Sequence, residues 1–397
     1  MPSLSLKHRS LALFVFFFLP GVSMASWVTR TPAIRDKLGA STAEMGLVLF
    51  GLSIGSMAGI LSSGYLVQRF STKPVIAAGT SLVIAGILLV ALGAFFSSAL
   101  TVSAGLCLFG AGMGSAEIAI NVEGADVERL SHRPLLPMLH GCFSLGTLVG
   151  AGIGNGLTSV NFPIQWHLFL IGVICIPATL WALKSVPRGN GLRSSTTDTA
   201  DKNATTVTTT NVWKDRRLIL IGLIVLAMAL AEGSANDWLP LLMVDGHGFS
   251  PTSGSLIYTG FALGMTAGRF CGGYFLRRFG RVNVVRGSAI FGVIGLGLII
   301  FAENTFLVSA SVLFWGIGAS LGFPLTLSAA SDTGPNPAAR VSAVATTGYI
   351  AFLVGPPMLG FLGEHLGLRS AMIVVLALVT FAIWLAPAVG EPPKSNA

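Results

Sequence analysis

Long apolar runs, separated by short polar segments, follow one another along the whole chain. A helix needs about 20 mostly apolar residues to cross the hydrocarbon core of a bilayer, and these runs have that length. The pattern therefore predicts twelve membrane-spanning helices, at 10–30, 44–67, 74–96, 98–122, 134–159, 163–185, 216–243, 252–276, 282–302, 305–330, 341–363 and 367–388.

One stretch of this pattern occurs twice. Residues 51–75 match residues 260–284 at a constant offset of 209 positions, with an apolar, glycine-rich run followed by basic residues in both copies. The identical pairs are Gly51/Gly260, Gly55/Gly264, Ala58/Ala267, Gly59/Gly268, Gly64/Gly273, Tyr65/Tyr274, Arg69/Arg278, Phe70/Phe279 and Val75/Val284. A repeat at about half the chain length is typical of membrane proteins made of two duplicated halves.

The long polar stretch of the chain separates the sixth and seventh apolar runs. From Arg188 to Lys214 it is rich in Ser and Thr and nearly lacks large apolar residues, so it cannot form a core and is predicted to be a flexible linker. We predict an all-α membrane protein of two pseudo-symmetric six-helix bundles. The N-terminal bundle covers 1–187, a cytoplasmic linker covers 188–214, and the C-terminal bundle covers 215–397.

Composition supports a membrane protein, with the lipid bilayer as its surroundings. Hydrophobic residues make up 53% of the chain and charged residues 10%, against about 25% charged residues in soluble domains. The net charge of +8 does not indicate a nucleic-acid partner, because the basic residues lie in short loops where they set membrane orientation. With both termini in the cytoplasm, most Lys and Arg lie inside; the exceptions are Arg30, Arg35, Lys37 and Arg369 outside and Arg269 within a span.

No cofactor, metal site or enzymatic activity is predicted. The four cysteines, Cys107, Cys142, Cys175 and Cys271, are scattered through apolar runs without paired spacing and are interpreted as buried apolar residues. The phosphate-binding pattern G-x-x-x-x-G-K-[ST] does not occur, and neither does a nucleophile–base constellation. The first apolar run lacks a small-residue cleavage site, so we interpret it as an uncleaved first span.

The loops after the second and eighth spans carry a recognisable motif. Residues 64–73 read G-Y-L-V-Q-R-F-S-T-K, and residues 273–281 read G-Y-F-L-R-R-F-G-R. Together with the two halves and the central linker, they resemble the major facilitator superfamily, whose signature is G-x-x-x-D-R-x-G-R-[RK]. The resemblance covers the whole chain and implies a twelve-helix transporter. Gln68 and Arg277 replace the family's aspartate, which puts the usual charge-based latch of these loops in doubt.

Two shorter stretches resemble narrower groups. Residues 110–121 resemble the fourth helix of the fucose:proton symporter group, in which a glutamate and an asparagine four residues later face the central cavity. Residues 231–240 and 243–255 resemble a branch of enterobacterial inner-membrane proteins, which implies a location in the bacterial inner membrane. For that branch the resemblance brings membership and no substrate.

A stripe on the fourth span carries the first candidate for proton coupling. Gly110, Gly114, Glu117, Asn121 and Gly124 share one helix face, and glycines allow close helix packing, so this face should contact protein. A carboxylate at mid-membrane is costly and therefore a functional hypothesis. We predict that Glu117 holds a proton in a closed apolar cavity and releases it to water. The alternative is a structural carboxyl group.

The fifth span supplies a second candidate. His140 lies on one face with Ser144 and could pair with Glu117 or titrate near neutral pH. We predict that it takes part in proton coupling; a packing histidine is the alternative.

Polar and aromatic residues within the spans are the candidates for substrate binding. Arg30 could attract an anionic solute group or anchor the outer interface. In the seventh span Glu232 and Asn236 share a face, whereas Asp237 points elsewhere. The aromatic candidates could equally serve packing or the membrane interface. The predicted set is Trp27, Arg30, Asn121, Ser144, Glu232, Asn236 and Tyr349.

Charges near the cytoplasmic ends of the spans are predicted to gate the pathway. Asp332 and Arg340 flank the loop between spans ten and eleven, and Asp126 and Arg129 flank the matching loop of the first half. Arg269 could also cap carbonyls or pair with an acid. The predicted gating set is Arg69, Lys73, Asp126, Arg129, Arg269, Arg278, Asp332 and Arg340.

These features favour a monomeric secondary transporter that couples protons to the movement of a small polar solute by alternating access. A sugar-like solute follows from the symporter resemblance alone. The alternatives are a carrier for drug or metabolite efflux and a membrane sensor that binds a ligand without moving it. The direction of solute accumulation in inside-out vesicles distinguishes an efflux carrier from an uptake transporter. Specific binding without flux identifies a sensor.

Overall fold

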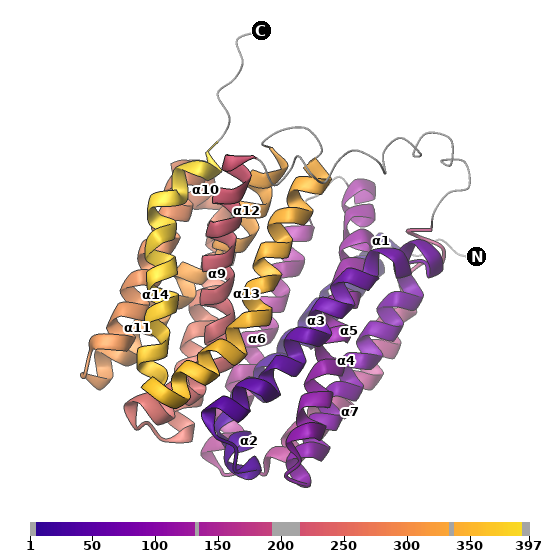
Figure 1. Ribbon diagram of the computed structural model, residues 1–397. Coiled ribbons are helices and arrows are strands. Elements are labelled where there is room, and N and C mark those ends of the chain that lie inside the picture. The colour runs from indigo at the N-terminus through magenta and orange to yellow at the C-terminus, as the bar shows by residue number, and fades with distance from the viewer. Residues whose placement is uncertain (1–4, 132–134, 193–214, 333–336, 391–397) are drawn as a thin grey trace. The chain divides into compact units, whose positions relative to one another are not determined.

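The computed structural model describes residues 5–131, 135–192, 215–332 and 337–390, and all regular structure in these ranges is helical (Figure 1). The prediction of an all-α fold is confirmed. Most of the predicted linker, residues 193–214, lies outside the described residues. The elements are α1 (Leu6–Val28), α2 (Thr31–Leu38), α3 (Thr42–Phe70), α4 (Thr72–Phe95), α5 (Ala99–Ser131), α6 (Leu136–Ser159), α7 (Ile164–Leu183), α9 (Arg216–Leu241), η1 (Leu242–Gly246), α10 (Pro251–Phe301), α11 (Thr305–Ser320), α12 (Gly322–Ser331), α13 (Pro337–Leu366), α14 (Leu368–Leu385) and η2 (Ala386–Val389).

The described helices correspond to the twelve predicted spans. Ten of them are long and apolar enough to cross a membrane; α10 contributes two such segments because its helical geometry breaks at Gly280, and α6, with 24 residues, is the twelfth. Two boundaries differ from the prediction. The eighth and ninth spans are joined with no loop other than the break at Gly280, and the tenth is interrupted at Leu321, where α11 gives way to α12.

Backbone contacts divide the chain into two compact units. The first contains α1 to α7, and the second contains α9, most of α10 and α11 to α14; Phe249–Thr259, at the start of α10, group with the first unit. In the first unit α5 packs against α3 and α4, and α1 packs against α6 and α7. In the second unit α9 packs against α13, α14 and α12.

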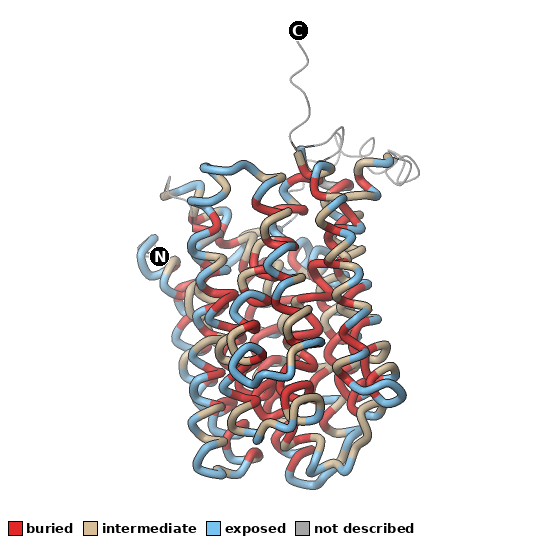
Figure 2. The backbone as a smooth tube through the Cα atoms, turned by 90° about the vertical axis from the view of Figure 1, so that its left-hand side faces the viewer, coloured by how far each residue is buried: buried red, intermediate tan, exposed pale blue. Residues whose placement is uncertain are grey.

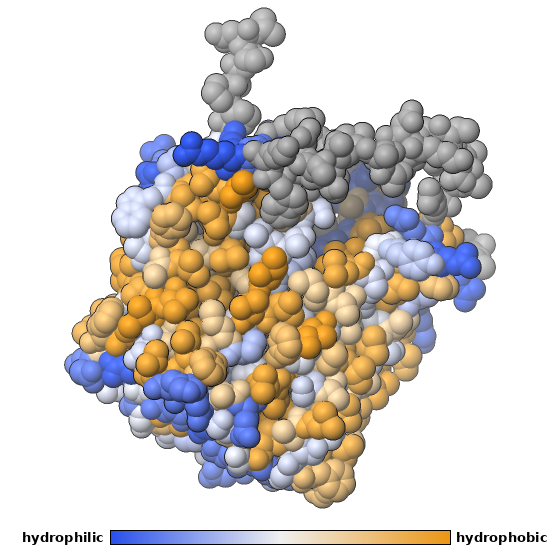
Figure 3. Space-filling model, viewed as in Figure 1, coloured by the Kyte–Doolittle hydropathy of each residue, from blue (hydrophilic) through white to orange (hydrophobic). Residues whose placement is uncertain are grey.

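Both units bury small and apolar side chains between helices and leave apolar side chains on the outside. In the first unit Leu13, Phe16 and Leu139 form part of a buried cluster, and buried residues lie along the helix faces turned toward neighbouring helices (Figure 2). Large apolar side chains such as Leu100 and Trp384 are nevertheless exposed, and apolar residues cover the sides of the helices while hydrophilic ones gather at their ends (Figure 3). Such a surface suits lipid, since helices satisfy their own backbone hydrogen bonds.

The 209-residue repeat is visible in the local structure of its two copies. At the start of α3, Ser41 Oγ accepts a hydrogen bond from the Glu44 N–H at 3.2 Å. The positions 209 residues later, at the start of α10, repeat this cap: Ser250 Oγ accepts from the Ser253 N–H, also at 3.2 Å. Each hydroxyl satisfies an N–H that the first helical turn would leave without a partner.

The repeat also preserves an unusual backbone turn at its end. Ser71, between α3 and α4, has φ 72° and ψ 168°, and Gly280 has φ 74° and ψ 164°. Positive φ with extended ψ is a region that is nearly restricted to glycine. The second copy has glycine in this conformation, which suits it, whereas the first copy has Ser71, whose Cβ makes the conformation unfavourable.

Candidate functional site

The stripe on α5 contacts protein, as the sequence predicts. A methyl group added at Gly110 would lie 2.2 Å from the carbonyl oxygen of Leu52, and one at Gly114 would lie 2.7 Å from that of Ser56, so both glycines permit the close approach of α3. Further along the same stripe, Glu117 and Asn121 are partly buried. The Oδ1 atom of Asn121 is enclosed and has no hydrogen-bond partner among the described residues, which leaves an acceptor available to a polar ligand or water.

The other first-unit candidates divide between the surface and the interior. His140 is exposed on α6, and its ring meets Phe17 of α1 edge-on at 4.9 Å. Ser144, one turn further along α6, is buried and donates to the carbonyl of His140 at 3.3 Å. Trp27 on α1 is fully buried, and its indole N–H has no partner among the described residues.

Arg30 lies where α1, α6 and α7 meet. It is buried, and its guanidinium donates to Thr158 Oγ1 at 2.8 Å and to the carbonyl of Phe162. Both acceptors are at the C-terminal end of α6, where a cation is favoured by the helix dipole. These contacts fit a structural role for Arg30 at this end of the unit. That role resembles the predicted alternative, in which Arg30 anchors the interface, more than it resembles solute binding.

In the second unit the acidic candidate on α9 is paired. Glu232 Oε1 accepts a hydrogen bond from Arg269 of α10 at 2.9 Å, and both side chains are largely buried. Arg269 is one of the predicted gating charges. Its position makes it the counter-ion of Glu232, which is the predicted alternative of pairing with an acid. One residue before Glu232, the carbonyl of Ala231 accepts the indole N–H of Trp315 at 3.0 Å.

The remaining substrate candidates of this unit are Asn236 and Tyr349. Asn236 is partly buried one turn after Glu232, so the two share a face as predicted. Tyr349 on α13 lies beside Phe323 of α12, with ring centroids 6.4 Å apart.

The gating candidates form local contacts at helix ends. Lys73 Nζ donates to the carbonyl of Val186 at 2.8 Å, which ties α4 to the end of α7. Arg69 and Arg278, the matching residues of the two repeats, are exposed.

In the second unit Asp332 and Arg340 form ion pairs. Asp332 pairs with Arg281 at 2.7 Å, and Arg340 pairs with Asp215, the residue that caps α9. Burial alone would raise the pKa of Asp215, but hydrogen bonds from Arg340 and from the N–H groups of Leu218 and Arg217 outweigh it and lower that pKa below 3.8.

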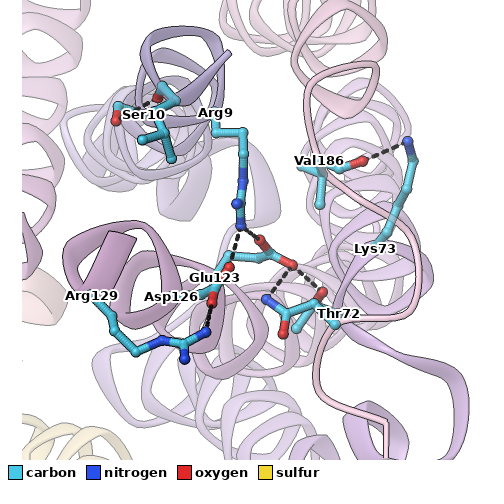
Figure 4. Close-up of polar contacts among 10 residues, drawn as sticks. Arg9, Ser10, Thr72, Lys73, Glu123, Asp126, Arg129 and Val186 are labelled. Atoms are coloured by element: carbon cyan, nitrogen blue, oxygen red, sulfur yellow. Dashed lines mark hydrogen bonds and ion pairs between the residues drawn. The ribbon is translucent and has the colours of Figure 1, made fainter. Parts of the chain in front are cut away.

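A buried network at one end of the first unit was not predicted. Glu123 of α5 is almost completely buried and accepts hydrogen bonds from Arg9 at 2.9 Å, from Asn190 at 3.0 Å and from Thr72. Arg9 reaches Asp126 as well, at 2.7 Å (Figure 4). The network joins α1, α4, α5 and the segment after α7.

The repeat could have drawn attention to this network. The 209-residue offset relates Thr72 to Arg281 and Glu123 to Asp332, so the hydrogen bond between Thr72 and Glu123 and the ion pair between Arg281 and Asp332 occupy equivalent places. Asp126, a predicted gating residue, belongs to this network and also pairs with Arg129 at 2.7 Å.

Within the part of the chain that the structure describes, no group of three or more His, Cys, Asp or Glu side chains could hold a metal ion. The polar groups that the structure describes inside the membrane-spanning helices include acids, amides, hydroxyls, arginines and the histidines His140 and His167. Such groups can bind a polar solute or a proton.

Two helical units, apolar outer surfaces and polar groups inside the spans define a multi-pass membrane carrier. The profile of the Major Facilitator Superfamily matches residues 10–351 and, in a second match, 239–397. The chain belongs to this superfamily, whose members are transporters rather than enzymes.

Individual relatives agree with this membership. An uncharacterized MFS-type transporter of Yersinia pestis is 29% identical over 368 residues, which cover 92% of each chain. Two solved structures share the fold at 14% identity. They are a D-xylose-proton symporter, with a TM-score of 0.77 over 98% of this chain and 99% of that one, and a mutant of the nucleoside transporter NupG, with a TM-score of 0.75 over 96% and 99%.

Proposed function

We propose that this chain is a proton-coupled secondary transporter that moves a small polar solute across the bacterial inner membrane, with both termini in the cytoplasm. The observation that carries the proposal is the pair of polar faces inside apolar helices, Glu117 with Asn121 on α5 and Glu232 with Asn236 on α9. Polar groups at membrane depth are costly and mark substrate or ion pathways. Hydrogen-bonding side chains of this kind suit a solute rich in hydroxyl or amide groups.

The proposal assigns proton coupling to Glu117. A carboxyl group in a closed apolar site favours its neutral form and loses its proton when water or a cation reaches it. Alternating access changes the surroundings of such a group in each cycle, and this links proton movement to solute movement. The resemblance of residues 110–121 to the fucose:proton symporter group supports this assignment. His140 stays a second candidate.

The substrate class is proposed to be sugars or nucleosides. The symporter resemblance supports sugars, and the D-xylose and nucleoside transporters with the same fold make both classes the first to test. The amide of Asn121 and the Glu232–Asn236 face would bind the hydroxyl groups of such solutes.

A stability screen followed by flux measurements tests the proposal. Purified protein is heated with individual sugars and nucleosides at two pH values, because a ligand that binds only the folded state raises its stability, by about 2.7 kcal/mol at 100 times its Kd. Compounds that stabilise the protein are then offered to proteoliposomes under an imposed pH gradient. We expect gradient-driven accumulation of at least one of them. Specific binding without any flux would instead identify a sensor.

A further inference from the structure

Asp237 of α9 is a buried carboxyl group for which the described residues provide no cation. It is 6% exposed, and no described residue forms a hydrogen bond or ion pair with it. Other buried acids of the chain are compensated: Glu232 pairs with Arg269, and Glu123 pairs with Arg9. Asp237 therefore differs from these acids because no cation lies beside it among the described residues.

The elements packed against α9 do not supply a counter-charge. α11, α12 and η2 contain no ionisable residue. The ionisable groups of α13, α14 and η1, together with Arg269 of α10, contact other partners. The arginines contact acids: Arg340 pairs with Asp215, Arg269 with Glu232, and Arg369 with Glu303 and the carbonyl of Ile300. His365 contacts the carbonyl of Phe361, and Tyr349, Glu364 and Asp245 have contacts of their own.

The backbone around Asp237 is irregular. Pro240 lies inside α9 three residues later and has no N–H to donate to the carbonyl of Asn236, the residue beside Asp237. The helix then continues as a π-helical turn over Leu242–Gly246, a rare feature that occurs frequently at functional sites. Interrupted helices inside membranes are tolerated where they line a cavity or are covered by protein.

We propose that Asp237 is a proton-binding group of this transporter. An ionised carboxylate without a cation is strongly disfavoured in such surroundings, so the closed bundle holds the neutral acid. When water reaches the site, the carboxylic acid gives up its proton and becomes a carboxylate, and no other bond changes. Asp237 lies 21 residues beyond Arg216, or about 31 Å along the helix at 1.5 Å per residue, so it lies near the end of α9 opposite its basic start.

The protonation state is tested by infrared spectroscopy, independently of any substrate. All proteins are compared in the Glu117→Gln background, because the proposed function keeps Glu117 protonated as well. We expect the background protein near neutral pH to show the C=O band of a neutral carboxylic acid, and the added Asp237→Asn to lose it. Asp245→Asn is the matched control. It removes an exposed acid that lies nine residues after Asn236, in the π-helical turn, and it should keep the band. Asn has the shape of the neutral acid, so the variant should fold with nearly unchanged stability. A band that persists in Asp237→Asn, or a large loss of stability, would overturn the proposal.

The coupling role rests on the proposed function and has its own readout. Proteoliposomes are offered uridine and D-xylose, first under an inward pH gradient and then in exchange without a gradient. Asp237→Asn should lose gradient-driven accumulation and keep exchange, whereas Asp245→Asn should keep both. Accumulation by Asp237→Asn at the wild-type level would remove Asp237 from coupling. If the wild type moves neither probe, the proposed function fails for these solutes, while the infrared band still decides whether Asp237 carries a proton.

Discussion

Replacing Ser71 with glycine should stabilise the protein. Ser71 has a φ of 72°, in the range that side chains with a Cβ rarely adopt. Its N–H donates to the carbonyl of Val67 at 2.8 Å, a bond that glycine keeps, and its side chain makes no capping hydrogen bond to α4. The substitution therefore removes strain without breaking a side-chain hydrogen bond to the described residues.

The expected gain is about 1 kcal/mol in the free energy of unfolding. A residue held in a sparsely populated backbone region costs about 1–3 kcal/mol, while the greater freedom of glycine in the unfolded chain offsets about 0.5–1 kcal/mol. Gly280 is the natural counterpart. A Cβ added there would meet nothing within 4 Å, so Gly280→Ser should cost about 1–2 kcal/mol through the backbone alone.

The assay is reversible unfolding in mixed detergent micelles, followed by tryptophan fluorescence. Ser71→Ala is the control, since alanine removes the hydroxyl group but keeps the Cβ and hence the strain. We expect Ser71→Gly to be more stable than both the wild type and Ser71→Ala. If Ser71→Gly is no more stable than Ser71→Ala, the backbone at this turn is not strained and the reasoning is refuted.

Three further predictions concern charges. Glu232→Gln should cost about 3 kcal/mol of unfolding free energy, because it leaves the largely buried Arg269 without its carboxylate; Glu232→Gln combined with Arg269→Met should recover most of this loss in the same unfolding assay. Because the pKa of Asp215 is lowered in the folded protein, its pairing with Arg340 should contribute stability above pH 3.8 and lose that contribution as the pH falls through the lowered value. The stability difference between the wild type and Asp215→Asn, measured from pH 7 downward, should therefore shrink in this acid range; a constant difference would contradict the assignment. Glu117→Gln should abolish pH-driven accumulation in proteoliposomes while sparing exchange, and unchanged proton dependence would remove Glu117 from the mechanism.

The fold followed from the sequence because it depends on patterns that repeat over many residues. Apolar runs of membrane length predicted the spans, and the 209-residue repeat predicted two duplicated halves. The matching caps at Ser41 and Ser250 are a finding of the structure. The break in the tenth span at Leu321 was not predicted, although Gly322 and Pro324 follow it directly and proline has no N–H to donate to the carbonyl of Ser320.

The candidate site was less accessible to sequence reasoning, because ion pairs join residues far apart in the chain. Helical spacing placed Glu232 and Asn236 on one face, yet nothing in that spacing indicated that Arg269 on another helix pairs with Glu232. The same limit hid the contact between Arg9 and Glu123, which lie 114 positions apart. Asp237 was passed over because it lies off the Glu232–Asn236 face, and only the packing around it reveals that it lacks a cation.

The two halves share their backbone plan and differ in their chemistry. At the offset of 209 positions, Glu117 corresponds to Thr326 and Asp237 corresponds to Val28, so neither acid has an ionisable counterpart in the other half. Where polar contacts do correspond, a hydrogen bond from the uncharged Thr72 to Glu123 matches the ion pair between Arg281 and Asp332. Because the proton-binding acid proposed in each unit has no duplicate in the other, neither unit can replace the acid that the other loses. Substitution of either Glu117 or Asp237 should therefore be enough to abolish proton-driven transport.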